Sequence, residues 1–304
     1  MSGFRRSPAP LFMIWEATHD CNLDCSLCYL RGIKDKRTGT LKTTEIKRIV
    51  GEAARAGLFC LVISGGEPLL RNDVFEVREY AKRLGLLASL TTNGLLIDRS
   101  NIAEISEFDQ ITVSIDGMHE NAYRGMGRAA NAGPKDLADT IRALRDLSPG
   151  LMLNAQIVVH AGNWPNLLDD NAKFYNLGVD AVFQLTYDSR FEIDRALWYS
   201  MIDRMQFRNA KLGWIQRRFL RLFPQIAEGS FVSPCLALTS NFVVSPEGHL
   251  LPCNYQRVRI ADLRERPFPA VWEGLGGLRK RYSSRKRACT CANTCFVMPA
   301  MVLA

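Results

Sequence analysis

Eight of the nine cysteines in this chain fall into clusters whose spacing suits metal binding. Cys21, Cys25 and Cys28 lie close together near the start, and five more lie between residues 235 and 295. In a reducing compartment such clusters bind metal more often than they form disulfides. Three thiolates are one short of a closed zinc site, whereas on a cubane iron–sulfur cluster they leave one iron open. The spacing alone leaves open a zinc site completed by a distant residue such as His19.

Strand-like and helical segments alternate from residue 11 to about residue 187, and they must position these cysteines. The expected strands are 11–18, 59–64, 86–92, 110–115, 151–160 and 181–187. The expected helices are 43–56, 74–84, 100–107, 134–147 and 164–176, with N-caps at Thr43, Asp73 and Asn163 and stops at Gly57, Gly85 and Gly178. This alternation predicts an α/β fold with a parallel sheet, as a partial barrel or an open doubly wound sheet. In both folds the site lies at the carboxyl ends of the strands.

The cysteine spacing after the first strand resembles the signature of radical S-adenosylmethionine (SAM) enzymes. Three further motifs follow in that family's order at the ends of expected strands: Ser64-Gly65-Gly66-Glu67-Pro68, Thr92-Asn93-Gly94 and Ser114-Ile115-Asp116-Gly117. Each motif alone is weak, since Asn-Gly is an ordinary turn. Four motifs in order favour a partial (β/α)6 TIM-like barrel of this family. Leu27 departs from it, because the family often has an aromatic residue before the third cysteine, and here Tyr29 follows that cysteine instead.

The resemblance implies that Cys21, Cys25 and Cys28 bind a 4Fe–4S cluster and that the other motifs bind SAM. The SAM-binding residues it implies are Tyr29, Gly65, Gly66, Glu67, Pro68, Thr92, Asn93, Ser114 and Asp116, with Arg124 or Arg128 beside the SAM carboxylate. A glycine pair lets backbone approach a ligand closely, and a glutamate such as Glu67 accepts charge-assisted hydrogen bonds from an ammonium.

The late cysteines resemble the ligands of SPASM and twitch auxiliary-cluster domains. Cys235-x12-Gly248-x4-Cys253 has their spacing, and Cys289, Cys291 and Cys295 follow. Five cysteines cannot fully ligate two clusters, so we expect one auxiliary 4Fe–4S cluster, with Cys289 or Cys291 spare. A zinc ribbon is the alternative. The expected domains are a barrel at 1–189, an amphipathic helical linker at 190–232 and an auxiliary domain at 233–304.

The mechanism that the resemblance implies is reductive cleavage of SAM to a 5′-deoxyadenosyl radical, which takes hydrogen from a substrate carbon. The auxiliary cluster then accepts an electron from the substrate or binds it. His160 ends the fifth expected strand and Asp188 follows the sixth, which makes them candidates for acid–base catalysis. Cys60 lies within an apolar strand and is expected in the core.

The sequence is consistent with three functions. The first is oxidation or rearrangement of a small metabolite, and the second is modification of a ribosomally made peptide. The third is non-catalytic electron transfer. Many peptide-modifying relatives carry an N-terminal recognition domain, and the first expected strand begins near residue 11, so a small molecule or a separate recognition partner is expected.

Composition narrows the range of partners. The chain has 304 residues with a net charge of +8, and its basic stretches at 195–221 and 279–287 suit a solvated surface, an acidic redox partner or an anionic substrate. A low-potential donor such as flavodoxin or ferredoxin is expected, and no nucleic-acid motif occurs. Without an apolar run of membrane-spanning length or a signal peptide, a cytoplasmic protein is expected.

Overall fold

The computed structural model describes residues 8–33, 39–119, 122, 126, 134–185, 193–228, 230 and 235–283. Six of the predicted site residues and ligands therefore lie outside the described residues: Arg124, Arg128, Asp188, Cys289, Cys291 and Cys295. The chain forms two compact units. One comprises the described parts of Met1–Asn22, Tyr29–Thr91 and Cys235–Arg285, and the other those of Leu23–Cys28, Thr92–Pro234 and Lys286–Ala304.

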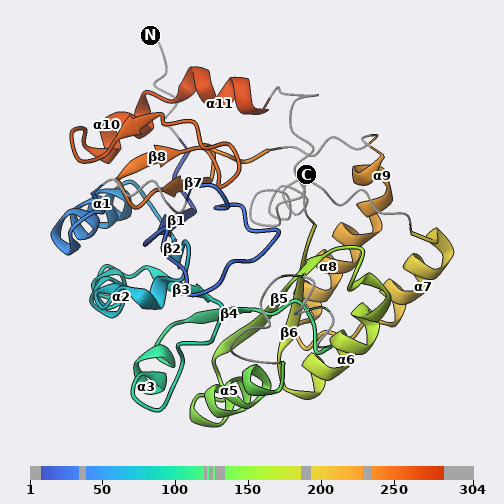
Figure 1. Cartoon of the computed structure of the whole chain (residues 1–304). Helices are drawn as coiled ribbons and strands as arrows, with labels where there is room; N and C mark the ends of the chain where they lie inside the picture. Colours follow the sequence, from blue (N-terminus) through green and yellow to red (C-terminus); the bar gives the residue numbers. More distant parts are fainter. Residues whose placement is uncertain are drawn as a thin grey trace. The chain divides into compact units, whose positions relative to one another are not determined.

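The first unit is built on parallel strands that begin the β/α alternation. Strands β1 (Phe12–Glu16), β2 (Cys60–Ser64) and β3 (Leu87–Thr92) pair side by side, with Met13 opposite Leu61 and Leu61 opposite Ala88. Helix α1 (Thr43–Arg55) follows β1, and the short helix η1 (Pro68–Leu70) and α2 (Val74–Arg83) follow β2. Helices α1 and α2 lie side by side along these strands (Figure 1). The carboxyl ends of β1 and β2 thus lie at one edge.

A late segment of the chain completes this unit. Strand β7 (Asn241–Val244) pairs parallel to β1, so that Phe12 lies opposite Asn241, and β8 (His249–Leu251) and β9 (Ala261–Asp262) continue antiparallel. Helices α10 (Phe268–Glu273) and α11 (Gly276–Ser283) follow. The rings of Phe242, Phe268 and Trp272 stack in its core, with centroids 4.9 and 5.5 Å apart. The β7–β8 hairpin, which lies between Cys235 and Cys253, is therefore hydrogen-bonded directly to β1.

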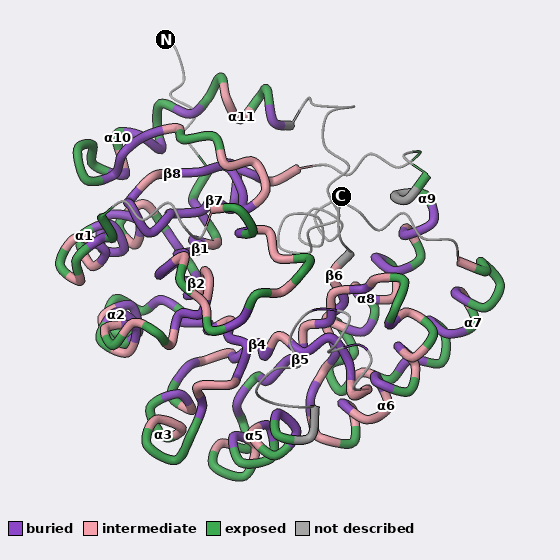
Figure 2. Tube along the Cα trace, in the orientation of Figure 1, coloured by how far each residue is buried: buried purple, intermediate pink, exposed green. Residues whose placement is uncertain are grey.

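The second unit continues the β/α alternation. Strands β4 (Gln110–Ser114), β5 (Met152–Val159) and β6 (Asp180–Leu185) are parallel neighbours. Its helices are α3 (Ile102–Ile105), α5 (Pro134–Leu147), η2 (Trp164–Asn166), α6 (Leu167–Asn176), α7 (Arg195–Arg204), α8 (Ala210–Arg221) and α9 (Phe223–Ala227). Helices α6 and α8 pack beside β6. Figure 2 shows that the strands are largely buried while the outer helix faces are exposed.

The six expected strands and five expected helical regions are all present, with slightly different bounds. Gly57, Gly85 and Gly178 end their helices in the left-handed region, as predicted. Lys42, and not Thr43, occupies the N-cap of α1: its N–H donates to Glu45 Oε2, and Thr43 Oγ1 donates instead to Asp73 Oδ2 at 2.7 Å.

The amphipathic helix expected within the linker at 190–232 is interrupted in the structure. It ends at Arg204 and resumes at Ala210, because the Asp180 carboxylate accepts the backbone N–H groups of Arg208 and Asn209 in between. The domain boundaries predicted at 189 and 232 stay predictions. No helix in the described part of the chain is long and apolar enough to cross a membrane.

Candidate functional site

The first cysteine cluster lies on the loop that follows β1. Cys21, Cys25 and Cys28 are each partly exposed, and none of them is in a disulfide. The backbone N–H of Cys28 donates to the carbonyl of Cys25 at 3.2 Å, which closes a tight turn between the last two cysteines. Three accessible thiols on one short loop fit a cubane cluster that keeps one iron open.

The loop from Ser64 to Pro68 packs directly onto the backbone that leads into Cys21. Gly66 N–H donates to Thr18 O at 2.7 Å, and Glu67 N–H donates to Asp20 O at 2.8 Å. A Cβ on Gly66 would lie 2.1 Å from the Asp20 carbonyl oxygen, and Gly65 has a φ of 124°. The glycine pair was expected to let a ligand approach the backbone closely. Among the described residues, the backbone of the cysteine loop is what lies close to this pair.

Glu67 and Arg71 organise the turn after β2. The side chain of Glu67 is completely buried, and its Oε1 accepts the Leu69 N–H at 3.1 Å at the start of η1. Arg71 donates to Ala17 O and Leu41 O, each at 3.0 Å, and pairs with Asp73. Burial acts to raise the pKa of Asp73, but hydrogen bonds from Arg71 and Thr43 hold that pKa below its usual value. Arg71 was not predicted from the sequence, in which its only signal is its place just after the Ser64–Pro68 motif.

Thr92 and Asn93 shape the turn after β3. Thr92 Oγ1 accepts the Gly94 N–H at 3.0 Å, and Asn93 Oδ1 accepts the Leu95 N–H at 2.9 Å. Gly94 has a φ of 80°, and a Cβ there would lie 2.8 Å from Leu137. The motif thus forms a preorganised turn. The SAM contact predicted for Thr92 and Asn93 would be an additional role of these residues.

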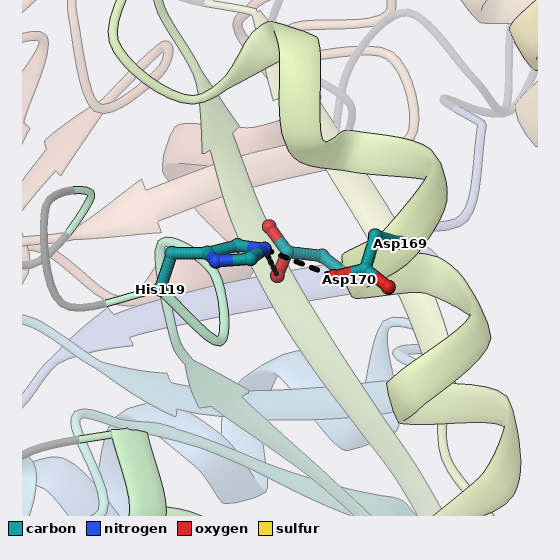
Figure 3. Close-up of side chains that lie close together, drawn as sticks. All are labelled: His119, Asp169 and Asp170. Carbon is teal, nitrogen blue, oxygen red and sulfur yellow. Dashed lines mark hydrogen bonds and ion pairs between the residues drawn. The ribbon is translucent and has the colours of Figure 1, made fainter.

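One histidine and two aspartates form a cluster between the turn after β4, which carries His119, and helix α6, which carries Asp169 and Asp170 (Figure 3). Asp170 of α6 is buried, and its Oδ1 accepts the Met118 N–H at 2.7 Å. His119 Nε2 lies 3.0 Å from Asp169 Oδ2 and 3.6 Å from Asp170 Oδ1. Burial raises the pKa of Asp170.

The predicted residues of this turn are held from a neighbouring loop. Asp116 is completely buried, and its carbonyl accepts Asn163 Nδ2 at 2.9 Å, while Ser114 ends β4. Gly117, at a φ of 145°, is needed because a Cβ would lie 2.6 Å from Asp170 Oδ2. Sequence reasoning did not find Asp170, because nothing in its helix pattern marks its contact with a loop some fifty residues earlier.

His160, a predicted catalytic residue, lies directly after β5. Its Nδ1 accepts the Gly162 N–H at 3.1 Å, so the neutral ring carries its proton on Nε2. Nε2 is buried and has no hydrogen-bond partner among the described residues. Burial lowers the pKa of His160 below its usual value. The ring is therefore a neutral donor whose buried Nε2–H has no acceptor among the described residues.

The second cysteine cluster flanks one end of the β7–β8 hairpin. Cys235 precedes β7 and Cys253 follows β8, and neither is in a disulfide. The Cys253 sulfur accepts the Gln256 N–H at 3.1 Å, and the Cys235 sulfur accepts the Ala237 N–H at 3.5 Å. Backbone N–H groups aimed at sulfur stabilise thiolates and tune cluster potentials. These two residues thus fit a metal cluster, with Cys289, Cys291 and Cys295 as its further predicted ligands.

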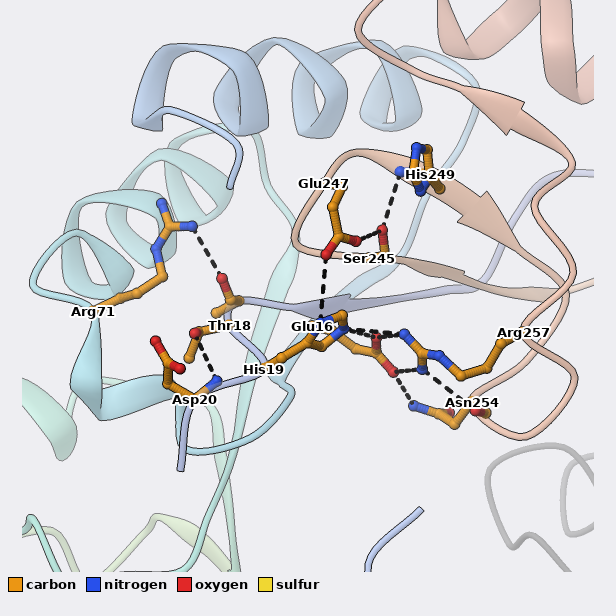
Figure 4. A network of polar contacts seen from close by, with 11 residues as sticks. Glu16, Thr18, His19, Asp20, Arg71, Ser245, Glu247, His249, Asn254 and Arg257 are labelled. Carbon is orange, nitrogen blue, oxygen red and sulfur yellow. Dashed lines mark hydrogen bonds and ion pairs between the residues drawn. The ribbon is translucent and has the colours of Figure 1, made fainter. Parts of the chain in front are cut away.

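A buried polar network connects the two cysteine-bearing loops of the first unit (Figure 4). Glu16, the last residue of β1, accepts from Arg257 Nη1 at 2.9 Å and from Nη2 at 2.8 Å, and Asn254 Nδ2 donates to it at 3.2 Å. Burial acts to raise the pKa of Glu16, but hydrogen bonds with His19 and Arg257 hold that pKa below its usual value. Of these network residues only His19 was named from the sequence, as a possible zinc ligand.

Comparison with known proteins identifies the family. Residues 15–163 match the model of the radical SAM superfamily. The AdoMet-dependent heme synthase of Methanosarcina barkeri is 30% identical over 299 residues, covering 90% of this chain and 84% of that protein. The chain belongs to the radical SAM superfamily. The PqqA peptide cyclase of Methylobacterium sp. is 34% identical over 158 residues, covering 51% of this chain and 41% of that protein.

The fold agrees with that assignment. The crystal structure of Streptococcus suis SuiB bound to S-adenosylmethionine superposes with a TM-score of 0.66 at 16% identity, over 89% of this chain and 66% of that one. The predicted partial (β/α)6 barrel is confirmed. The radical SAM family implies a SAM-binding 4Fe–4S cluster, and the thiols of Cys21, Cys25 and Cys28 fit it. The chain is an enzyme of this class.

Proposed function

We propose that this radical SAM enzyme oxidises a small anionic molecule of the iron-porphyrin class, with the help of one auxiliary 4Fe–4S cluster. Cys21, Cys25 and Cys28 hold the SAM-binding cluster in this proposal. Cys235, Cys253 and at least two of the later cysteines hold the auxiliary one. A low-potential donor such as flavodoxin or ferredoxin is expected to supply the electron.

The observation that carries the proposal is the extent of similarity to the heme synthase. That relative aligns with this chain over 84% of its own length, whereas the alignment with the PqqA peptide cyclase covers 41% of the cyclase. Similarity that extends over most of both proteins favours a related substrate more than similarity confined to part of one protein does. Fold alone would not decide this, because one fold serves many reactions.

In this proposal the chain's own residues bind SAM and the substrate and orient them. With Cys21, Cys25 and Cys28 holding the first cluster, SAM and that cluster would supply the radical chemistry that removes one hydrogen atom from the substrate, and a cluster held by Cys235 and Cys253 would supply an acceptor for the second electron. Glu67, buried after β2, receives the SAM ammonium, and Thr92 and Asn93 are further SAM-binding residues that the family resemblance implies. The Nε2–H of His160 donates to an anionic group of the substrate, since a neutral donor needs no proton uptake. Asp188 stays a candidate base after β6.

A peptide substrate is the second candidate, because the PqqA peptide cyclase has the higher identity, at 34%, over the part it shares. In that case the same SAM site acts on a side chain of a ribosomally made precursor. The two candidates differ in the substrate that stimulates SAM cleavage.

The test is anaerobic turnover with each substrate class. The reconstituted enzyme is mixed with SAM, dithionite and either iron coproporphyrin III, which carries four propionate groups, or a PqqA-type precursor peptide. The proposal predicts porphyrin-stimulated 5′-deoxyadenosine together with a porphyrin of lower mass. The Cys25→Ala variant should lose both products, while Cys60→Ala, a cysteine outside the proposed ligand set, should behave as wild type. Modification of the peptide alone would replace the porphyrin proposal with the second candidate.

A further inference from the structure

Two loops of the first unit, far apart in the sequence, are fastened to each other where each carries a cysteine. One loop runs from Glu16 through Cys21, and the other begins at Cys253 after β8. Their main link is the two-pronged ion pair between Glu16 and Arg257, whose partners are 241 positions apart. The rings of Tyr29 and Tyr255 add a second contact, with centroids 5.9 Å apart.

The link is buried and has several anchors. Glu16 is completely buried, and the Arg257 side chain is 19% exposed. Arg257 Nη2 also lies 3.1 Å from His19 Nε2, and His19 Nδ1 lies 3.4 Å from Glu247 Oε1. Glu247 in turn accepts from Ser245 Oγ at 2.6 Å. The end of β1, just before Cys21, is therefore held by three residues of segment 241–262, which we call the auxiliary segment. These residues are Glu247, Asn254 and Arg257.

From this anchor the contacts continue to the loop predicted to bind SAM. Between Glu16 and Cys21, the carbonyls of Thr18 and Asp20 accept the Gly66 and Glu67 N–H groups. Because a Cβ on Gly66 would overlap Asp20 O, these two stretches of backbone are in direct contact. A shift of residues 16–20 would consequently move the Glu67 backbone.

We propose that Arg257 is a positioning residue for SAM: by holding Glu16 and His19, it fixes the 17–20 backbone on which the Gly65–Glu67 loop rests. The inference rests on the proposed function only in taking Glu67 as a SAM contact. It makes the auxiliary segment part of the SAM site, so disturbing the segment at Arg257 weakens SAM binding.

Guanidinium chemistry suits this role. A planar fork with two parallel N–H···O bonds fixes both the distance and the orientation of a carboxylate. A lysine keeps the charge but cannot reproduce the fork. Arg259 offers a matched control, since it lies on the same segment, pairs with Asp262 and is 54% exposed.

The first experiment uses the apoprotein, so it needs neither cluster nor turnover. Amide hydrogen exchange is measured in wild type, Arg257→Gln, Arg257→Lys and Arg259→Gln. Both changes at Arg257 should speed exchange of the Gly66 and Glu67 amides by about tenfold. The Leu87 amide, bonded to Phe59 O between β2 and β3, should not change, and Arg259→Gln should match wild type. Unchanged exchange at Gly66 and Glu67, or equal acceleration at Leu87, would overturn the proposal.

The second experiment separates positioning from a general loss of folded enzyme. The Kd for SAM of the reconstituted enzyme and the SAM dependence of 5′-deoxyadenosine formation are measured for the same variants. Arg257→Gln should raise the Kd and the KM for SAM about tenfold, with kcat within about twofold of wild type. A fall in kcat with unchanged KM and Kd would contradict it. If wild type forms no 5′-deoxyadenosine, the proposed function fails, while the exchange and SAM-binding data still decide the role of Arg257.

Discussion

Glu16 and Arg257 form a buried, two-pronged ion pair, with N···O distances of 2.9 and 2.8 Å, between the first barrel strand and the segment after Cys253. Such a pair contributes little net stability relative to apolar residues of the same shape, yet removal of one partner leaves an uncompensated charge inside the protein. The pair therefore fixes the relative position of the two segments more than it stabilises the fold.

Replacement of Glu16 with Gln should destabilise the apoprotein by about 3 to 5 kcal/mol at pH 7, because Arg257 is then left without its carboxylate. In the folded protein the pKa of Glu16 lies below its ordinary value of 4.5. The ion pair therefore stabilises the protein fully above pH 4.5, the pKa of the unfolded state. This stabilisation is lost as the pH falls through the folded pKa. Urea unfolding from pH 3 to 7 should show the variant and wild type converging at the acid end. Glu79→Gln, which removes an exposed partner of Arg83, should change the free energy of unfolding by less than about 0.5 kcal/mol.

Replacement of Gly66 with Ala should destabilise the cysteine loop, because the new Cβ would lie 2.1 Å from the Asp20 carbonyl oxygen. Overlap with backbone costs about 1 to 3 kcal/mol or more. Gly150→Ala is the control, since no atom lies within 4 Å of its Cβ position. Thermal unfolding of both apoproteins measures the difference. Equal melting temperatures would show that the Gly65–Pro68 loop does not rest on residues 17–20.

Sequence reasoning predicted the parts of the site that depend on local patterns. Local sequence patterns are enough to recognise the cysteine spacing, the strand–helix alternation and the Gly65–Gly66 pair. The structure has the corresponding elements. The Glu16–Arg257 pair and the contact of Asp170 with Met118 were not predictable, because both join distant segments whose register depends on the folded sheet. The helix break after Arg204 was missed for the same reason: Asp180, on β6, supplies the acceptors for the interrupting backbone.

Two features of Asp170 affect the stability of the folded protein: its raised pKa and its hydrogen bond to Met118. A carboxylic acid whose pKa is raised by burial favours the folded state when protonated, so its contribution falls as the pH rises from 3.8 through the folded pKa. Asp170→Asn keeps an acceptor for the Met118 N–H without the charge, whereas Asp170→Ala leaves that N–H unsatisfied. At pH 7 we expect the Asn variant to be more stable than the Ala variant by about 1 to 3 kcal/mol. Chemical denaturation measures both, with Asp139→Asn as an exposed control. A less stable Asn variant would contradict the hydrogen-bond assignment.

Substitutions of His160 can distinguish the roles of its two ring nitrogens. Asn retains an acceptor near the Nδ1 position, which serves Gly162, and Gln retains a donor near the Nε2 position, which faces the proposed substrate. If the Nε2–H binds an anionic group, His160→Asn should lower kcat/KM for that substrate by roughly tenfold to a hundredfold. His160→Gln should lose less, and SAM cleavage without substrate should be unchanged in both. Equal losses in the two variants, or a loss of substrate-free SAM cleavage, would remove His160 from substrate binding. Because burial lowers the pKa of His160, the neutral ring should persist below pH 6.5.

Iron content distinguishes the cysteines. Cys60 lies within β2 and is buried, so Cys60→Ala should bind as much iron and sulfide as wild type. Cys21→Ala and Cys253→Ala should each lose about one cluster's iron after reconstitution. Full iron in Cys253→Ala would show that this residue is not a ligand of the auxiliary cluster.

The most direct test of the account is the formation of 5′-deoxyadenosine from SAM under anaerobic, strongly reducing conditions, measured by mass spectrometry. We expect product from the reconstituted wild type and from Cys60→Ala, and none from Cys25→Ala. Absence of product from a wild type with both clusters loaded and SAM bound, at every substrate tried, would contradict it.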